Sequence, residues 1–282
     1  MKKILIESLK AWVDHRAASK GAALAFYTLF SLTSILPVTI AIAGYFFGVE
    51  AAQGEIVGQI QALVGPNGAQ AIQALLAGAR NHASGIIATI VASVLLLIGA
   101  TSVFAELKDS LDEMWEAVPS RRPAFLTLVR TRFLSFGLVL VLGFLLLVSL
   151  VVSAALAVLE RYAGEIWSNS FVILSFLSTL ISFSVIASLF AVIYKMLPEA
   201  SLSWRDVWIG AVFTAGLFMV GKYAIGLYLG NSGVASSFGA AGSVIALLLW
   251  VYYSAQIFFL GAEFTRQYAL CYGSHRHQQA RR

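Results

Sequence analysis

Charge is scarce in this 282-residue chain: Asp, Glu, Lys and Arg together make up 12% of the residues, whereas 59% are hydrophobic. A soluble domain usually carries about a quarter charged residues, so this scarcity excludes an ordinary water-soluble domain. Cysteine is scarcer still, because Cys271 stands alone in the sequence. An intramolecular disulfide is therefore excluded, and the redox compartment cannot be inferred from cysteine pairing.

Motifs for nucleotide or metal chemistry are also missing. The Gly-Pro-Asn-Gly run at 65–68 lacks the lysine and the preceding strand that a phosphate-binding loop needs. This argues against ATP-driven transport by the chain alone. The histidines are scattered and make no ligand set: His15, His82, His275 and His277. Cys271 with His275 and His277 is a weak zinc pattern in the tail. We expect no metal, no cofactor, no catalytic residues and hence no enzyme.

Long uncharged stretches are what the chain has in abundance. Six are present, at 21–49, 85–105, 133–159, 171–194, 207–221 and 223–262. A helix of about 20 apolar residues crosses roughly 30 Å of hydrocarbon, and a helix satisfies its backbone groups internally. We predict an all-α polytopic membrane protein with six transmembrane helices, at about 21–48, 85–105, 133–159, 171–195, 207–229 and 238–263.

The basic residues are distributed unevenly around these six helices. Sixteen of the nineteen Lys and Arg residues lie on one side, Arg80 and Arg161 lie on the other, and Lys222 lies inside a helix. Basic residues accumulate in cytoplasmic loops, which places both termini in the cytoplasm of a bacterial inner membrane. The net charge of +5 then reflects orientation and attraction to membrane lipids. We expect no nucleic-acid partner.

Three further segments flank or interrupt the membrane domain, which we place at 21–268. Residues 1–20 carry apolar side chains at helical spacing, among them Leu5, Leu9 and Val13, and predict an amphipathic cytoplasmic helix on the membrane surface. The first apolar run is too long for a signal-peptide core, so we expect it to remain as an anchor. Residues 50–82 predict a helical hairpin on the outer face, with 65–68 as its turn. Residues 269–282 form a basic cytoplasmic tail.

Acidic residues gather on one face of the helix that continues beyond residue 105. Leu107, Leu111 and Met114 share the opposite, apolar face. The acidic face consists of Glu106, Asp109, Glu113 and Glu116. Carboxylates bind Mg²⁺ and could serve phosphodiester cleavage, but this pattern is typical of any solvated amphipathic helix. The solvated interpretation is the one that we favour.

Lys222 is the basic residue that orientation does not explain. A charge inside a membrane helix costs about 2.5–3.5 kcal/mol on insertion scales. At about 1.5 Å per residue it lies about 22 Å from Val207, in the outer third of the helix. Its ammonium group could reach the outer headgroups, or it could bind an anionic headgroup in a cavity. With the polar faces of the first and last helices, the candidate substrate-binding residues are Lys222, Tyr27, Ser31, Tyr252, Tyr253 and Gln256.

Three segments together resemble the YihY/BrkB family of bacterial inner-membrane proteins. They are KGAALAFYTLFSL at 20–32 with Pro37 beyond it, FAELKDSLDEMW at 104–115, and FGAAGSV at 238–244 followed by LWVYYSAQI at 249–257 and LGAEFTR at 260–266. The likeness spans roughly residues 10–270. Phe26 departs from it, because many relatives have tyrosine there. The resemblance implies a six-helix protein without an assigned reaction. Some relatives are associated with serum resistance, and transport of lipid or lipopolysaccharide precursors has been suggested for them.

The same family carries an older label, ribonuclease BN, for a tRNA-processing nuclease. A nuclease needs a cytoplasmic catalytic constellation, and the cytoplasmic segments here are each under about 30 residues. We therefore expect transport or flipping of an anionic lipid or another amphiphilic envelope component. The main alternative is a non-transporting scaffold for envelope assembly or resistance, and the nuclease is a remote third. Membrane lipids are the expected partners, and a homo-oligomer is left open.

Overall fold

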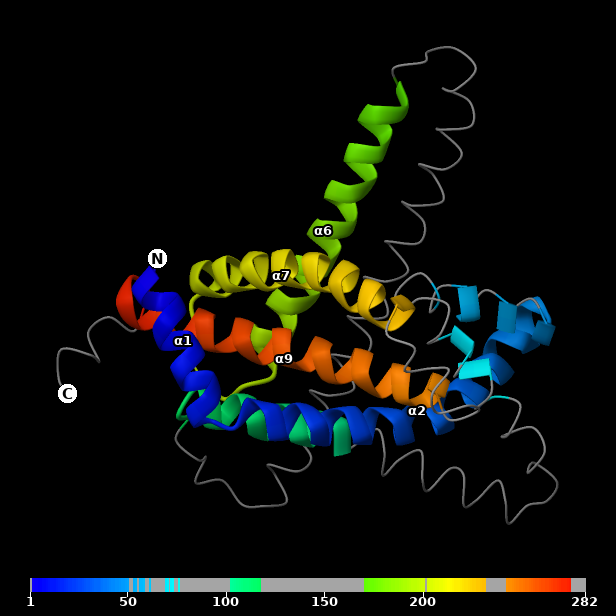
Figure 1. The fold of residues 1–282 in the computed structure, drawn as a ribbon, viewed down its shortest axis with the longest axis horizontal. Coiled ribbons are helices and arrows are strands. Elements are labelled where there is room, and N and C mark those ends of the chain that lie inside the picture. The colour runs from blue at the N-terminus through cyan, green and yellow to red at the C-terminus, as the bar shows by residue number, and fades with distance from the viewer. Residues whose placement is uncertain are drawn as a thin grey trace. The chain divides into compact units, whose positions relative to one another are not determined.

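The elements of the chain that the structure describes are all helical (Figure 1). They are α1 (Lys2–Asp14), α2 (Ala17–Phe47), α6 (Ser170–Met196), α7 (Trp204–Asn231) and α9 (Gly242–Cys271), with a further helical segment at 102–114. The computed structural model describes residues 2–50, 53, 54, 56–58, 61, 69, 70, 72, 73, 76, 102–117, 170–200, 202–231 and 242–274. The predicted all-helical class is confirmed for these residues.

Three of the described helices are long and apolar enough to cross a membrane: Thr179–Met196, Trp204–Tyr228 and Val244–Cys271. They coincide with the spans predicted at 171–195, 207–229 and 238–263. Helix α2 covers the first predicted span and is continuous through Pro37. The spans predicted at 85–105 and 133–159 lie outside the described residues, apart from 102–105, which are helical.

The observed helix ends differ from the edges of the uncharged runs. Helix α7 begins at Trp204 because the Ser203 hydroxyl caps it, accepting a hydrogen bond from the Arg205 N–H at 3.4 Å. Helix α9 continues to Cys271, beyond the predicted end at 263, and Arg266 lies within it. A charged residue marks the end of an apolar run, but it does not end a helix, because Lys, Arg and Glu are good helix formers.

Helix α1 is amphipathic, as the sequence predicts, and it ends where Arg16 adopts a left-handed conformation with φ 51°. Ile4 and Ser8 are buried, whereas the apolar side chains of Leu5, Ile6, Leu9 and Val13 are 41–64% exposed. Lys2, Lys3 and Lys10 are exposed as well. This combination is typical of a helix that lies on a lipid surface. The membrane-surface position itself stays a prediction.

The chain divides into two compact units. The first comprises Met1–Ala11, Leu111–Met219 and Leu260–Arg282, and the second comprises Trp12–Ser110 and Val220–Phe259. Helices α7 and α9 contribute residues to both units.

In the first unit, α7 and α9 are joined by two reciprocal contacts between glycine and threonine. A Cβ atom on Gly210 would lie 1.7 Å from Oγ1 of Thr265, and one on Gly261 would lie 1.9 Å from Oγ1 of Thr214. Each threonine is four residues after the glycine of its own helix, and its hydroxyl donates to that glycine's carbonyl at 2.7 Å. The two helices therefore pack antiparallel at close range, with each missing side chain replaced by a hydroxyl from the other helix.

Aromatic side chains lie around this close contact, and some of them pack α6 against α7. Phe213 of α7 stacks on Phe264 of α9 with ring centroids 3.9 Å apart. The Tyr194 hydroxyl of α6 lies 3.1 Å from Oγ1 of Thr214, and Tyr194 is fully buried. Phe190 of α6 meets Phe218 of α7 edge to face at 5.8 Å. The hydroxyls at this three-helix contact thus have partners within the protein.

Polar contacts fasten the end of α9 and the neighbouring turns in the same unit. Asp206, 2% exposed in the first turn of α7, accepts hydrogen bonds from the N–H of Ser274 at 2.9 Å and from its hydroxyl at 2.7 Å. Arg266 pairs with Glu116 at 2.5 Å. The Glu199 N–H donates to the Asp112 carboxylate at 2.6 Å. Residues distant in sequence are thereby held at one end of α7 and α9.

The second unit is built on an apolar cluster that includes residues from α2, α9 and the segment between 50 and 76. Its buried members are Ile40, Val57, Ala69, Ile72, Leu76 and Leu247. Residues from both predicted halves of the 50–82 hairpin, such as Val57 and Ile72, belong to this cluster, and the described residues of both halves are helical. The predicted turn at 65–68 lies outside the described residues. A second cluster joins Ile225 of α7 to Ala246 of α9.

The reciprocal contacts predict that alanine is not tolerated at Gly210 or Gly261. Either substitution places a methyl group in steric overlap with the threonine hydroxyl of the neighbouring helix. Overpacking of this kind costs about 1–3 kcal/mol. We expect Gly210→Ala and Gly261→Ala to lower the thermal unfolding midpoint of the purified protein. Gly216→Ala is the matched control, because a Cβ there meets nothing within 4 Å. Equal melting temperatures for all three variants would contradict the contact.

The Asp206 carboxylate is expected to hold the end of α9 in place. Asp206→Ala leaves the Ser274 N–H and hydroxyl without their acceptor, at a cost of about 1–3 kcal/mol. We expect faster hydrogen–deuterium exchange at the backbone amides of 266–274. Asp206→Asn keeps an acceptor oxygen and is expected to show a smaller effect. Unchanged exchange in Asp206→Ala would rule out this role.

Candidate functional site

Gln256 is a polar side chain within the apolar span of α9 that the rest of the described structure does not satisfy. Both its Nε2 and its Oε1 are buried, and neither has a hydrogen-bond partner among the residues that the structure describes. The amide lies against Gly21 of α2, where a Cβ atom would be 2.0 Å from Nε2. The absence of a side chain at Gly21 therefore creates the space in which the amide sits.

Tyr253 lies one turn before Gln256 on α9 and contacts α7 at another glycine. A Cβ atom on Gly221 would lie 2.8 Å from the Tyr253 ring and 2.5 Å from Ile257. Tyr253 also packs against the cluster formed by Ile225 and Ala246. In the second unit, residues 253–257 of α9 thus contact glycines of both α2 and α7. We call Gly21, Gly221, Tyr253 and Gln256 the glutamine notch.

The predicted residues of α2 have mixed environments. Ser31 is 6% exposed and belongs to the buried polar residues, whereas Tyr27 is half-buried. The Tyr27 ring lies 6.0 Å from the ring of Phe26, which is itself 54% exposed. Tyr252 on α9 is half-buried as well. Tyr27, Ser31 and Tyr252 form no hydrogen bond with the Gln256 amide, so their membership of one site stays a prediction.

Lys222 has an exposed side chain. It follows Gly221, which is buried, but Val220 and Tyr223 on either side are 70% and 71% exposed. Lys222 therefore belongs to an outward-facing, largely apolar surface of α7. This environment fits an ammonium group that reaches the headgroup region along its own stem. The role of Lys222, whether at the headgroups or in a binding cavity, stays a prediction.

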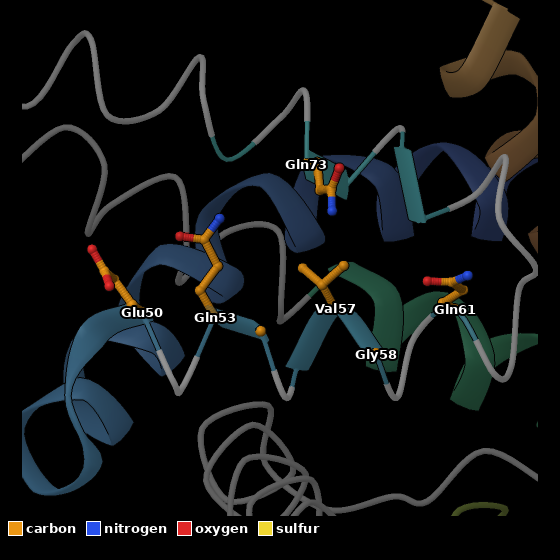
Figure 2. Close-up of a pocket in the computed structure, with 7 residues that line it drawn as sticks. Glu50, Gln53, Val57, Gly58, Gln61 and Gln73 are labelled. Atoms are coloured by element: carbon orange, nitrogen blue, oxygen red, sulfur yellow. The ribbon is translucent and has the colours of Figure 1, made fainter.

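A cleft that the sequence interpretation did not identify lies in the second unit (Figure 2). Its volume is about 470 Å³, and it is lined by Glu50, Gln53, Gly54, Val57, Gly58, Gln61 and Gln73. A sequence signal was available, because residues 50, 54, 58 and 61 recur at helical spacing with small or polar side chains. The sequence interpretation assigned this segment to a helical hairpin on the outer face and placed no candidate binding residue in it.

The acidic side chains after residue 105 take part in structural contacts. Leu111 and Met114 are fully buried, and Asp109, Glu113 and Glu116 are exposed, as the amphipathic pattern predicts. Glu116 pairs with Arg266. Across the ranges that the structure describes, no three His, Cys, Asp or Glu side chains gather as metal ligands. The notch and the cleft offer amides, hydroxyls and one carboxylate, which suit hydrogen bonding to a polar group.

Comparison with known proteins identifies a family and several relatives to which this chain is similar. The family described as "Virulence factor BrkB" matches residues 8–282. The chain is 27% identical over 257 residues to a UPF0761 membrane protein of Verminephrobacter eiseniae, covering 89% of this chain and 58% of that protein. It is 28% identical over 267 residues to one of Stenotrophomonas maltophilia, covering 92% and 59%. A third, from Neisseria meningitidis, is 26% identical over 241 residues, covering 84% and 56%.

The chain thus spans somewhat more than half the length of the curated relatives that it matches. No solved structure matches it. The family match covers nearly the whole sequence, including the three segments on which the resemblance was based. The membrane-length helices α6, α7 and α9 agree with the relatives' names as membrane proteins. The chain belongs to the BrkB/YihY (UPF0761) family of membrane proteins.

Proposed function

We propose that this protein moves an amphiphilic envelope component across the bacterial inner membrane, or between its leaflets, without altering it chemically. The observation that carries this proposal is the buried amide of Gln256, which has no hydrogen-bond partner among the described residues. An amide buried without a partner costs about 1–3 kcal/mol. A cost of this kind is offset when a passing ligand supplies the missing hydrogen bonds.

The contrast with the hydroxyls at the contact of α6, α7 and α9 supports this interpretation. Thr214 and Thr265 donate to carbonyls of their own helices, and Tyr194 meets Thr214. These hydroxyls stabilise helix packing and leave no group for a ligand. Gln256 has two buried polar atoms and a neighbouring glycine on α2. A polar group in a membrane helix that packing does not use is a candidate for substrate contact.

The orientation that fits this function has both termini in the cytoplasm. Sixteen basic residues on the side of the termini support this orientation through the positive-inside rule. The exposed apolar residues of α1, flanked by lysines, would then rest on the cytoplasmic leaflet. Membrane lipids are the partners that this arrangement implies.

A non-transporting scaffold is the second candidate, and the contact of α6, α7 and α9 favours it. The glycine–threonine pairs and the stacked Phe213 and Phe264 make a tightly packed unit. A scaffold needs rigidity of this kind and needs no unsatisfied amide. The two functions therefore differ in what they require of Gln256, and variants of this residue distinguish them.

Replacing Gln256 with leucine separates transport from stability. Gln256→Leu removes the unpaired amide and keeps a side chain of similar size, so we expect a melting temperature equal to or above that of the wild type. We expect lipid movement in reconstituted vesicles, measured by headgroup accessibility to a reductant, to fall at least tenfold. Gln267→Leu, on the same helix but outside the notch, is the matched control.

Gly21→Ala tests the same notch from α2. The added Cβ displaces the flexible end of the Gln256 side chain, so we expect a fold of nearly unchanged stability with reduced lipid movement. Wild-type transport in both Gln256→Leu and Gly21→Ala would overturn the proposal. Absence of movement of any anionic or zwitterionic lipid by the wild type would favour the scaffold.

Lys222 is expected to govern the preference for anionic lipids. At about 1.5 Å per residue it lies about 27 Å from Trp204, near the far end of the α7 span. An exposed ammonium group there can meet a phosphate at the edge of the bilayer. We expect Lys222→Met to leave stability unchanged and to lower the ratio of phosphatidylglycerol to phosphatidylcholine transport. An unchanged ratio would mean that Lys222 serves membrane anchoring alone.

A further inference from the structure

The cleft formed by residues between 50 and 73 has two sides (Figure 2). Glu50, Gln53, Val57, Gly58 and Gln61 follow one another along one side, and Gln73 faces them from the other side. Val57 is 6% exposed and packs with Ile72 and Leu76 in the apolar cluster of the second unit. The wall of the cleft is therefore anchored in packed core.

Two glycines keep the cleft open. Gly54 and Gly58 are four residues apart on one helical face, and a Cβ atom on either would meet nothing within 4 Å. Glycine is a poor helix former, by about 1 kcal/mol relative to alanine. Close packing requires glycine at positions 210 and 261, but it does not require glycine at positions 54 and 58. The two glycines leave space beside three glutamine side chains.

The polar groups of the cleft define the chemistry of a ligand. Gln61 and Gln73 each carry an amide that donates and accepts hydrogen bonds, and Glu50 adds an acceptor; Gln53 carries a third amide, which also interacts within the chain. Neither Lys, Arg nor His is present among its described lining residues. A single carboxylate repels an anionic headgroup, and one negative charge holds a divalent cation weakly, because affinity depends on the number of charged ligands. Hydroxyl groups, which both donate and accept, match this set.

We propose that this cleft binds an uncharged polyhydroxylated group of the sugar or polyol class. Its volume of about 470 Å³ lies within the roughly 300–1,000 Å³ of small-molecule sites. The ligand is either a soluble sugar or the headgroup of a glycolipid, because both present the same hydroxyl chemistry. Binding at the cleft does not depend on whether the protein transports the ligand.

The experiment uses the full chain purified in lauryldimethylamine oxide, because maltoside or glucoside detergents would compete for the cleft. Saturation-transfer NMR with maltose and myo-inositol probes the soluble source. Nanodiscs containing monogalactosyl diacylglycerol, compared with phosphatidylglycerol, probe the lipid source. We expect the wild type to bind at least one hydroxyl-rich probe and to prefer it to the anionic lipid.

Variants test whether the cleft is the binding site. Gly58→Leu fills open space, so we expect an unchanged melting temperature and at least a tenfold loss of binding. Gln61→Leu with Gln73→Leu removes two amides without filling the cleft and is expected to weaken binding similarly. Gly226→Leu on α7, where a Cβ also meets nothing within 4 Å, is the control. Gln256→Leu should keep sugar binding, which separates this site from the transport proposal.

Binding of a soluble probe or of the glycolipid alone would each support the proposal and identify the source. The proposal is overturned if none of the three hydroxyl-rich probes binds, if Gly58→Leu binds as the wild type does, or if phosphatidylglycerol binds more tightly than every hydroxyl-rich probe.

Discussion

The contact between α7 and α9 is the interaction on which the first unit depends. In a lipid environment apolar side chains gain little by packing against one another, because the surrounding acyl chains are equally apolar. Close backbone approach and satisfied hydroxyls must provide the stability instead. Gly210 with Thr265, and Gly261 with Thr214, provide both at once. Tyr194 and the stacked Phe213 and Phe264 attach to this contact.

The glycines discussed above have three different uses. At Gly210 and Gly261 it allows a threonine of the neighbouring helix to approach. At Gly21 it makes room for the Gln256 amide, which has no described partner. At Gly54 and Gly58 it leaves open space. The same residue type thus supports packing, an unsatisfied polar group and a cleft, and the neighbouring atoms decide which.

The sequence predicts the helices well and their partnerships poorly. Apolar runs and positive charges are local properties, so α2, α6, α7 and α9 were predicted from them at nearly their observed positions. Helix α9 continues past the predicted end of its membrane span at 263, and Arg266 within it pairs with Glu116, a partner 150 residues away in sequence that no local pattern indicates. Glycines four residues before a small residue occur at Gly210, Gly226 and Gly261 alike. Which of them meets another helix follows from tertiary structure alone.

In the candidate site, too, the sequence indicates individual residues, and the structure shows which other residues they contact. Gln256 and Tyr253 were selected as polar residues on the last helix, and the structure adds the glycines that they contact. Lys222 was selected for its charge, and the structure places it on an exposed surface. The cleft at Glu50 and Gln73 was missed although residues 50, 54, 58 and 61 recur at helical spacing, because the sequence does not show which faces of the two predicted halves turn toward each other.

The Asp206 carboxylate has a practical consequence for labelling. It holds the N–H and hydroxyl of Ser274, and Gly273 passes so close to it that a Cβ would lie 2.3 Å from Oδ1. The main chain at Gly273 and Ser274 is therefore fixed to the first turn of α7. A spectroscopic probe attached at Tyr272, whose side chain is exposed, would report the movement of that helix end.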